Sequence, residues 1–275
     1  MKKQLNNLRI LGVSALTLSL VMTLDSCKKE GCMDQNAVNY NHDAQKDDGS
    51  CTYDEGNQVT VNVNHMFGTD AMSTDSIYVD PQGTKYKFTR CDFYLSNFKF
   101  MDDNMNMLGM TDTMFLIKLG TTSLNMGKVD LTGHVHTMDA ILGLDSLTSY
   151  TVDPTLMPAG HPLAPQVPAM YWTWASGYIY FALEGVYDSN NDQVIDGSDQ
   201  TFAMHLGTYN FAVNNQFMIH QTLTANQDLN INLNLDYSQL FVGFDLANDN
   251  TTHTMDNMPL ANALKTNLAN FLSVN

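Results

Sequence analysis

Positive charge is scarce in this sequence. Its 13 Lys and Arg residues stand against 29 Asp and Glu, which gives a formal net charge of −16 at pH 7. A chain of this charge repels nucleic acid and anionic lipid and attracts cations, so the balance excludes a nucleic-acid-binding function. Charged residues of both signs make up only 15% of the chain. We therefore expect a surface of Asn, Thr, Ser and Asp, which is typical of an extracytoplasmic β protein.

Long hydrophobic runs are lacking at the N-terminus. The apolar segment Ile10–Leu24 has 15 residues, short of the roughly 20 that a transmembrane helix needs. It follows a basic start and precedes Ser26-Cys27, which is the order of a secretory signal. A Cys after a small residue resembles the lipobox of bacterial lipoproteins, in which cleavage precedes the Cys and acyl chains are attached to it.

We therefore predict a signal peptide over residues 1–26 and a lipid anchor at Cys27. We expect the protein to be located in the cell envelope. Its lipid would anchor it to the outer membrane, on the periplasmic side or on the surface side. Cleavage removes three basic residues and one acidic residue and leaves a net charge of −18. The alternative is an ordinary cleaved signal with an incidental Cys.

Cysteine is also rare, with four residues in the chain. Cys32 and Cys51 bracket a short polar segment and are predicted to form a disulfide, because the exported compartment is oxidising. Cys91 lies among apolar residues and is interpreted as a buried free thiol rather than a copper thiolate. The remaining chain of about 220 residues is long enough to bury a core without disulfides.

Residues 27–56 are predicted to form a small disulfide-bracketed module rich in Asp and Asn. It resembles a short repeat of secreted bacterial proteins with the pattern G-C-x-D-x-x-A-x-N-Y-N…D-D-G-S-C. It has too few apolar residues for a core, so a disulfide, alone or with an ion, must order it. Bound Ca²⁺ and a solvated spacer that lifts the next domain off the membrane are both open interpretations.

Residues 57–275 show repeated alternation of apolar and polar side chains, as over 59–65 and 229–235. This period of two predicts half-buried antiparallel strands. The predicted fold is an all-β, Ig-like antiparallel β-sandwich with a short C-terminal helix that Asn257 caps. Further strands are expected at residues 86–100, 114–119, 178–183 and 202–206, and a long proline-rich loop at 144–169.

The segment Asp188–Asp199 has the ligand spacing of a twelve-residue EF-hand-type Ca²⁺ loop. Gln193 replaces the usual turn Gly, and Asp199 replaces the usual Glu, as in dockerin-type loops. The alternative is a plain acidic hairpin turn. The candidate calcium ligands are Asp188, Asn190, Asp192, the Val194 carbonyl, Asp196 and Asp199.

Catalytic motifs are absent from the sequence. It has no nucleophile elbow, no H-E-x-x-H and no phosphate-binding loop, so we predict that the protein is not an enzyme. It does have 18 Met and 8 His; imidazole suits Cu and Zn, and thioether selects Cu(I). His134 and His136 would share a strand face, as a metal clip or as an exposed pair. Met170, Trp172 and Trp174 would share another, which taken alone favours core packing.

Several stretches together resemble one family. They are Phe93-Tyr94-Leu95-Ser96-Asn97-Phe98, the segment Met170–Tyr178 with the pattern M-x-W-x-W-x-S-G-Y, His205-Leu206-Gly207, and His253-x-Met255 before a helix. In this order they resemble the copper-binding MbnP-like family over roughly residues 57–272. The resemblance implies a secreted or lipid-anchored β-sandwich that binds copper for acquisition, delivery or buffering.

Carried over by motif, the expected copper ligands are drawn from His65, His205, Met170, Trp172 and Trp174, with His134, His136 and His253 as further candidates. In some relatives a Trp near the site is oxidised to kynurenine by a dihaem enzyme. The partners expected from the resemblance are therefore a dihaem peroxidase-like Trp-oxidising enzyme or an outer-membrane metal transporter. The alternative function is a surface module whose Ca²⁺-stiffened loops bind glycan or protein.

Overall fold

The computed structural model describes residues 28–35, 37–53, 56–173 and 176–275. The predicted signal peptide, Cys27 and Trp174 lie outside the described residues. The chain divides into two compact units, Met1–Asp54 and Glu55–Asn275. No helix in the described ranges is both long and apolar enough to cross a bilayer.

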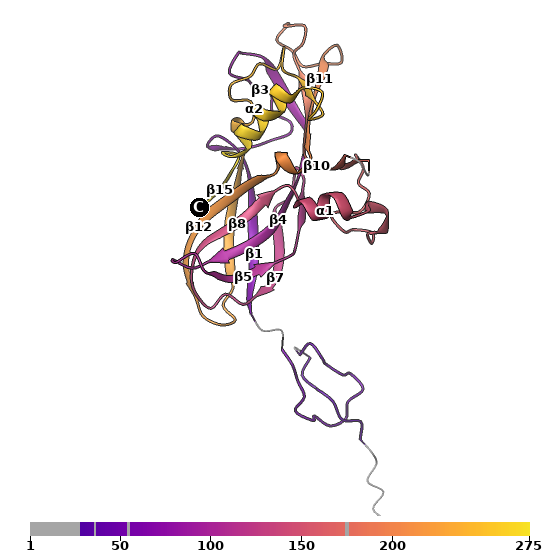
Figure 1. Ribbon diagram of the computed structural model, residues 1–275, viewed down its shortest axis with the longest axis vertical. Coiled ribbons are helices and arrows are strands. Elements are labelled where there is room, and N and C mark those ends of the chain that lie inside the picture. The colour runs from indigo at the N-terminus through magenta and orange to yellow at the C-terminus, as the bar shows by residue number, and fades with distance from the viewer. Residues whose placement is uncertain (1–27, 36, 54–55, 174–175) are drawn as a thin grey trace, which may run out of the picture. The chain divides into compact units, whose positions relative to one another are not determined.

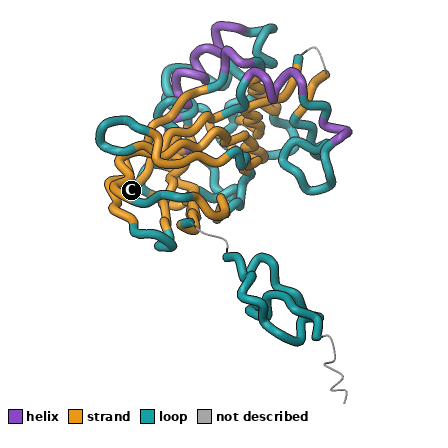
Figure 2. The backbone as a smooth tube through the Cα atoms, turned by 60° about the horizontal axis from the view of Figure 1, so that its bottom comes forward, coloured by secondary structure: helices purple, strands orange, loops and turns teal. Residues whose placement is uncertain are grey.

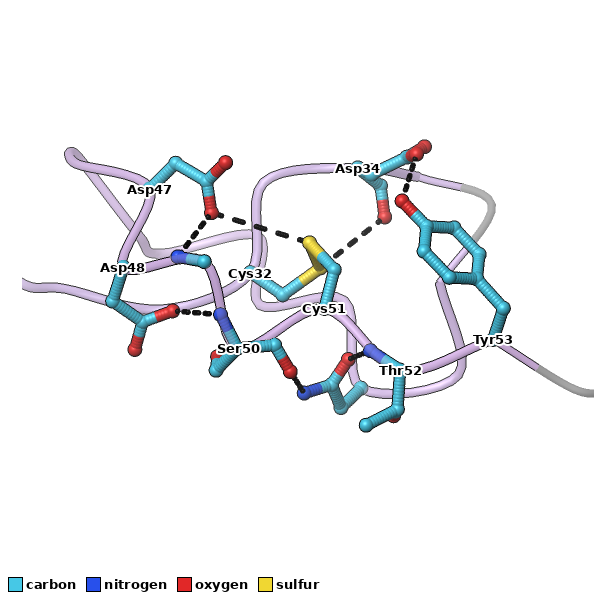
Figure 3. The surroundings of a disulfide bond; sticks show 10 residues. Cys32, Asp34, Asp47, Asp48, Ser50, Cys51, Thr52 and Tyr53 are labelled. Atoms are coloured by element: carbon cyan, nitrogen blue, oxygen red, sulfur yellow. Dashed lines mark hydrogen bonds between the residues drawn. A yellow bond between two sulfur atoms is a disulfide. The ribbon is translucent and has the colours of Figure 1, made fainter.

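The small unit is ordered by a disulfide and by polar contacts (Figure 3). Cys32 and Cys51 are bonded with their Cα atoms 4.7 Å apart, which confirms the predicted pairing. The Asn39 side chain donates to the Ser50 carbonyl at 2.7 Å and accepts from the Thr52 N–H at 2.8 Å. Because Cys32 and Ala37 are the buried hydrophobic residues among those described here, covalent and side-chain-to-backbone bonds replace a core.

The large unit contains two sheets, which confirms the predicted all-β sandwich (Figures 1 and 2). The five-stranded sheet has the order β15 (Leu272–Val274), β13 (Leu229–Asp236), β1 (Asn57–Phe67) and β2 (Asp70–Ala71), with β7 (Ser123–Val129) also paired to β1. The ten-stranded sheet has the order β12 (Val213–Leu223), β8 (Gly133–Leu142), β4 (Lys85–Met101), β10 (Gly177–Tyr187), β11 (Gln200–Gly207) and β14 (Thr251–Thr252). Its remaining strands are β3 (Tyr78–Val79), β5 (Met107–Thr111) and β6 (Phe115–Ile117), paired to β4, and β9 (Tyr171–Thr173), paired to β10.

The core lies between the inner faces of these sheets. Val59, Val61 and Val63 of β1 are buried and belong to the same cluster as Phe93 and Leu183 of the ten-stranded sheet. Their neighbours in β1 are half-buried or exposed, so the period-two alternation identified the inner face correctly. Cys91 is fully buried in this cluster, and burial raises the pKa of its thiol above the ordinary range.

The prediction of antiparallel strands fails for one pair. Strands β1 and β13 pair parallel, with Val59 opposite Leu229 and Leu235 opposite His65. Each strand also has an antiparallel neighbour, β7 for β1 and β15 for β13. Alternation reports which face of a strand is buried, and this is the same for either direction, so the pattern contained no information about orientation.

The helical segments lie at the edge of the strand layers (Figure 2). Helix α2 (Met258–Leu268) begins after Asn257, whose side chain accepts from the Leu260 N–H, and this confirms the predicted C-terminal helix. The proline-rich loop contains α1 (Ser146–Thr151), which lies beside β10 (Figure 1), and a 3₁₀ turn at Pro154–Leu156. Two further 3₁₀ turns occupy Tyr209–Phe211 and Tyr237–Gln239.

The proline-rich loop covers part of the outer face of the ten-stranded sheet. A second buried cluster joins Leu144 and Leu163 of this segment, and Met170 directly after it, to Tyr94 of β4 and Tyr180 of β10. The Tyr178 hydroxyl donates to the Leu163 carbonyl at 2.9 Å, and the Tyr94 hydroxyl donates to the Pro162 carbonyl at 3.2 Å. This outer cluster fixes the approach to β9, which contains Trp172.

Asn57 should be a strong stabilising residue of the large unit. It is fully buried; its amide nitrogen donates to the carbonyls of Thr224 and Gln227, each at 2.7 Å, and its oxygen accepts from the Leu131 N–H at 3.0 Å. We expect Asn57→Ala to lower the free energy of unfolding by about 3 kcal/mol, because it leaves buried backbone groups unsatisfied. Urea unfolding measures this change. The control is Asn64→Ala, an exposed Asn of the same strand that bonds Asn234, with an expected loss under about 1 kcal/mol; equal losses would contradict the assignment.

Candidate metal centre

A polar row crosses the outer face of three neighbouring strands. The register sets Glu184 of β10 opposite both Arg90 of β4 and Ala203 of β11, so these side chains share the face that His205 also occupies. Arg90 Nη1 donates to Glu184 Oε1 at 2.6 Å, and His205 Nε2 lies 2.9 Å from the same oxygen. Arg90 Nε donates to Asp92 Oδ2 at 2.8 Å. The buried guanidinium is thus held between two carboxylates.

The charges of this row set the state of His205. Partial burial acts to raise the pKa of Glu184, but the hydrogen bonds from Arg90 and His205 outweigh it and hold that pKa below its usual value. Burial lowers the pKa of His205, against the opposing effect of Glu184. The imidazole is therefore neutral at pH 7. Since a carboxylate only accepts, the proton is on Nε2, and the lone pair is on Nδ1.

His253 is brought beside His205 by a short parallel strand. In β14, Thr251 and Thr252 pair with Ala203 and Met204 of β11, so the next residue of each strand is a histidine. The Thr254 hydroxyl fixes this alignment, because it donates to the His205 carbonyl at 2.9 Å and accepts from the Gly207 N–H at 2.9 Å. The two imidazole ring centres lie 5.2 Å apart.

His253 is oriented by its own carboxylate. Its Nδ1 lies 2.9 Å from Asp256 Oδ2, and its backbone N–H donates to Asp256 Oδ1 at 2.6 Å. Since a carboxylate only accepts, Nδ1 donates in this bond, and Nε2 is the nitrogen that remains for a ligand. In the described residues, neither His205 Nδ1 nor His253 Nε2 has a hydrogen-bond partner. Two imidazoles, each bonded to a carboxylate at one nitrogen and unbonded at the other, match the arrangement that orients metal-binding histidines.

Trp172 lies against the strand that contains His205. A Cβ atom built on Gly207 would be 2.3 Å from Trp172 Cζ3, so only glycine allows the indole to lie on this backbone. Gly207 and His205 are two residues apart in β11 and share a face. Met170 lies deeper, 1% exposed, with its sulfur 3.0 Å from Arg90 Nη2. The structure therefore brings together Trp172, His205 and His253, with Met170 connected to them through Arg90 and Glu184.

Other predicted ligands are placed elsewhere. His65 is in the five-stranded sheet, where its Nδ1 lies 2.9 Å from the Tyr237 hydroxyl and its Nε2 lies 2.8 Å from the Thr121 carbonyl oxygen. Both of its nitrogens have protein partners, and neither partner belongs to the His205 group. His134 and His136 are on β8, which β4 and β10 separate from β11 in the strand order.

The predicted calcium loop is held by its own hydrogen bonds. Asp188 accepts from the N–H groups of Asp192 and Gln193, at 3.1 and 2.9 Å. Asp199 accepts from those of Ser189 and Asp196, at 3.0 and 2.9 Å. All twelve residues of this loop are described, and no three of its carboxylates have oxygens within 4.8 Å of one another. Asn190, Asp192, Val194 and Asp196 are exposed, and calcium binding here stays a prediction.

Sequence reasoning missed the partners that orient the histidines. Glu184, Arg90 and Asp256 carry no motif of their own, and Glu184 is 21 residues from His205. A local signal did exist for Asp256, which lies three residues after His253. The others become visible only once the pairing of β4, β10 and β11 is known.

The fold is a β-sandwich, and two carboxylate-bonded histidines on its outer face form a candidate metal centre. The family model of MbnP matches residues 56–256, and the chain belongs to this family, which is related to copper-binding proteins. The solved structure of MbnP from Methylosinus trichosporium is 12% identical, with 73% of this chain and 82% of that chain covered and a TM-score of 0.50, so it supports the fold alone. No curated protein matches the sequence.

The lowered pKa of Glu184 predicts a pH-dependent contribution to stability. A carboxyl with a depressed folded-state pKa contributes stability above its unfolded pKa of about 4.3, and loses it as the pH falls through the lower folded value. Glu184→Gln should therefore be less stable than wild type at pH 7, with a gap that narrows below about pH 4. Urea unfolding at pH 7, 5 and 3.5 measures the gap, with the exposed Asp228→Asn as the control for loss of one charge. A gap that widens towards pH 3.5 would contradict the assigned ion pair.

Proposed function

We propose that this protein is a cell-envelope lipoprotein that binds copper, at a centre formed by His205, His253 and Trp172, for acquisition, delivery or buffering. One observation carries the proposal. The two imidazoles lie with ring centres 5.2 Å apart, and each is hydrogen-bonded through one nitrogen to a carboxylate, while its other nitrogen has no partner among the described residues. Such paired carboxylate–histidine units fix tautomer and ring orientation before a metal arrives.

The donor set favours copper over hard cations. Neutral imidazole suits copper and zinc, whereas Ca²⁺ and Mg²⁺ select oxygen. Trp172 lies on Gly207, two residues after His205 on the same face of β11, and membership of a family related to copper-binding proteins supports the same ion. The Met170 thioether suits Cu(I), but it would have to leave Arg90 to act as a ligand.

The proposed membrane location depends on the predicted acyl chains and not on the charge of the chain. The predicted acyl chains at Cys27 would hold the protein at the bilayer, since each buried CH₂ contributes about 0.8 kcal/mol. The mature chain, at −18, would be repelled by anionic headgroups and would attract cations. We propose a binding role rather than an enzymatic one, with a Trp-oxidising dihaem enzyme or an outer-membrane metal transporter as the partner.

A second candidate function is a Ca²⁺-stiffened surface module. Gln193, at the position where Ca²⁺ loops need a turn residue, has φ 71°, the left-handed conformation that glycine usually supplies there. The loop backbone therefore already has the required turn. This candidate predicts Ca²⁺ retention without copper affinity.

Copper titration separates these candidates. We expect wild type to bind about one Cu(I) in competition with a chelator, and His205→Ala or His253→Ala to weaken binding at least tenfold because each removes one imidazole ligand. The control is His42→Ala, an 80% exposed His of the small unit, with unchanged affinity. If the His205→Ala/His253→Ala double variant binds Cu(I) as wild type does, the proposed centre is wrong.

Mass spectrometry tests the oxidised-Trp part of the proposal. No Asp lies between Asp153 and Asp188, so cleavage before Asp residues releases residues 153–187 with both tryptophans. We expect kynurenine at one of them in protein isolated from its native envelope, because Trp172 is half-buried beside the histidines. Protein expressed in a cytosol without the dihaem enzyme is the control and should be unmodified. An unmodified native peptide would contradict the oxidation but not copper binding.

A further inference from the structure

A second group of histidines lies towards the opposite edge of the ten-stranded sheet, on strands β8 and β12. His134 and His136 project from the outer face of β8, and His220 is on the neighbouring strand β12. Asp103 lies in the turn between β4 and β5, and β4 is the other neighbour of β8. Three adjacent strands thus converge on one place, although 31 positions separate Asp103 from His134 and His220 lies a further 86 positions along the chain.

The ligand atoms are already close. Asp103 Oδ2 lies 2.7 Å from His134 Nδ1, and Asp103 Oδ1 lies 3.2 Å from His136 Nδ1. One ligand atom from each of these three residues lies within 4.8 Å of the others. The His220 ring centre is 4.6 Å from that of His136 and 5.9 Å from that of His134. Donors around a tetrahedral Zn²⁺ are separated by about 3.3 Å, so little movement is needed.

A backbone irregularity brings His220 to this place. The register of β12 with β8 shifts between Met218 and Gln221, which face Thr137 and Val135, so β12 has one extra residue there. His220 lies within the shift and has φ 51°. A left-handed non-glycine residue costs on the order of 1 kcal/mol or more, and bulges of this kind redirect a side chain. The result is a third imidazole beside the other two.

Asp103 is held in place by a rigid turn. The neighbouring Asp102 accepts from the N–H groups of Asn104 and Asn106, both at 2.8 Å, and its backbone carbonyl accepts from the Met105 N–H at 3.0 Å. Met105 adopts φ 61° to close the turn. The carboxylate of Asp103 is therefore presented to the histidines by a preorganised backbone, which lowers the cost of binding a ligand.

His136 has an unsatisfied nitrogen. Its Nδ1 is buried and, across the described residues, makes no hydrogen bond, since the nearby Asp103 oxygen lies outside hydrogen-bond geometry. Buried polar atoms in native proteins nearly always have a partner. A lone pair directed at a carboxylate is unfavourable unless a proton or a cation lies between them.

We propose that Asp103, His134, His136 and His220 form a second metal site, which binds a divalent transition-metal ion such as Zn²⁺. Three imidazoles and one carboxylate are the ligands that this class of ion prefers, and they are unsuited to Ca²⁺ or Mg²⁺. The site is separate from the His205 centre, because β4 and β10 lie between β8 and β11 in the strand order. His220 is exposed, so an ion reaches the site from solvent.

Calorimetric titration with ZnCl₂ tests the site independently of the copper centre. The background is the metal-free full chain with His205→Ala and His253→Ala, which removes the first centre. We expect this background to bind one Zn²⁺ at pH 7.5 and to lose at least tenfold in affinity on addition of His220→Gln or His136→Gln. The matched control is addition of His161→Gln, a half-buried His outside both groups, with no change.

Thermal unfolding provides the second measurement. Zn²⁺ in excess should raise the melting temperature of the background, since a ligand that binds the native state stabilises it, and this rise should disappear with His220→Gln. His220 is exposed, so His220→Gln is expected to fold normally, and far-UV circular dichroism checks this. If His136→Gln is unstable, the His220→Gln variant alone decides the test. A background that binds no Zn²⁺, or equal affinity with and without His220→Gln and His136→Gln, would overturn the proposal and leave the copper proposal untouched.

Discussion

The backbone pairing of β4 with its neighbours is the interaction on which both candidate centres depend. The first half of β4 pairs with β10, opposite Tyr187 to Phe181, and its second half pairs with β8, opposite Leu142 to Thr137. The first pairing aligns Arg90 with Glu184 and hence with His205. The second places the turn after Met101, with Asp103, over His134 and His136. A shift of one residue in β4 would turn Arg90 to the opposite face and would move the turn that contains Asp103 relative to His134 and His136.

Burial of one positive charge links the copper candidate to the covering loop. Arg90 donates to Asp92, Glu184 and the Ala169 carbonyl, and its Nη2 contacts the Met170 sulfur. A buried guanidinium is stable only with its donors satisfied, so the end of the proline-rich segment is held against β4 and β10. Trp172 follows two residues after Met170, and its position on Gly207 depends on the same contacts. The loop and His205 thus contact the same ion pair, the loop through Arg90 and His205 through Glu184.

The sequence was informative where a pattern reports a local property. Alternation in residues 59–65 and 229–235 identified the buried faces, Asn257 and the apolar stripe identified α2, and the spacing of Cys32 and Cys51 identified the disulfide. It failed where the property depends on which strands meet. The parallel pairing of β1 with β13, the alignment of His253 with His205 by β14, and the bulge that presents His220 all join distant segments. His65 illustrates the same limit, since its strand was predicted correctly but its partners, Thr121 and Tyr237, were not predictable from periodicity.

The parallel pairing of β1 and β13 has a consequence for how the chain acquires its structure. Val59 and Leu229 are neighbours in the sheet although 170 residues separate them, and the closing strand β15 follows later still. Contacts of such high sequence separation form slowly, because a long loop must close before any interaction compensates for it. The first strand of the sandwich therefore has no partner on this side until nearly all of the polypeptide has been synthesised. The five-stranded sheet therefore cannot be completed while the chain is still being synthesised up to residue 229, although β7 can pair with β1 much earlier.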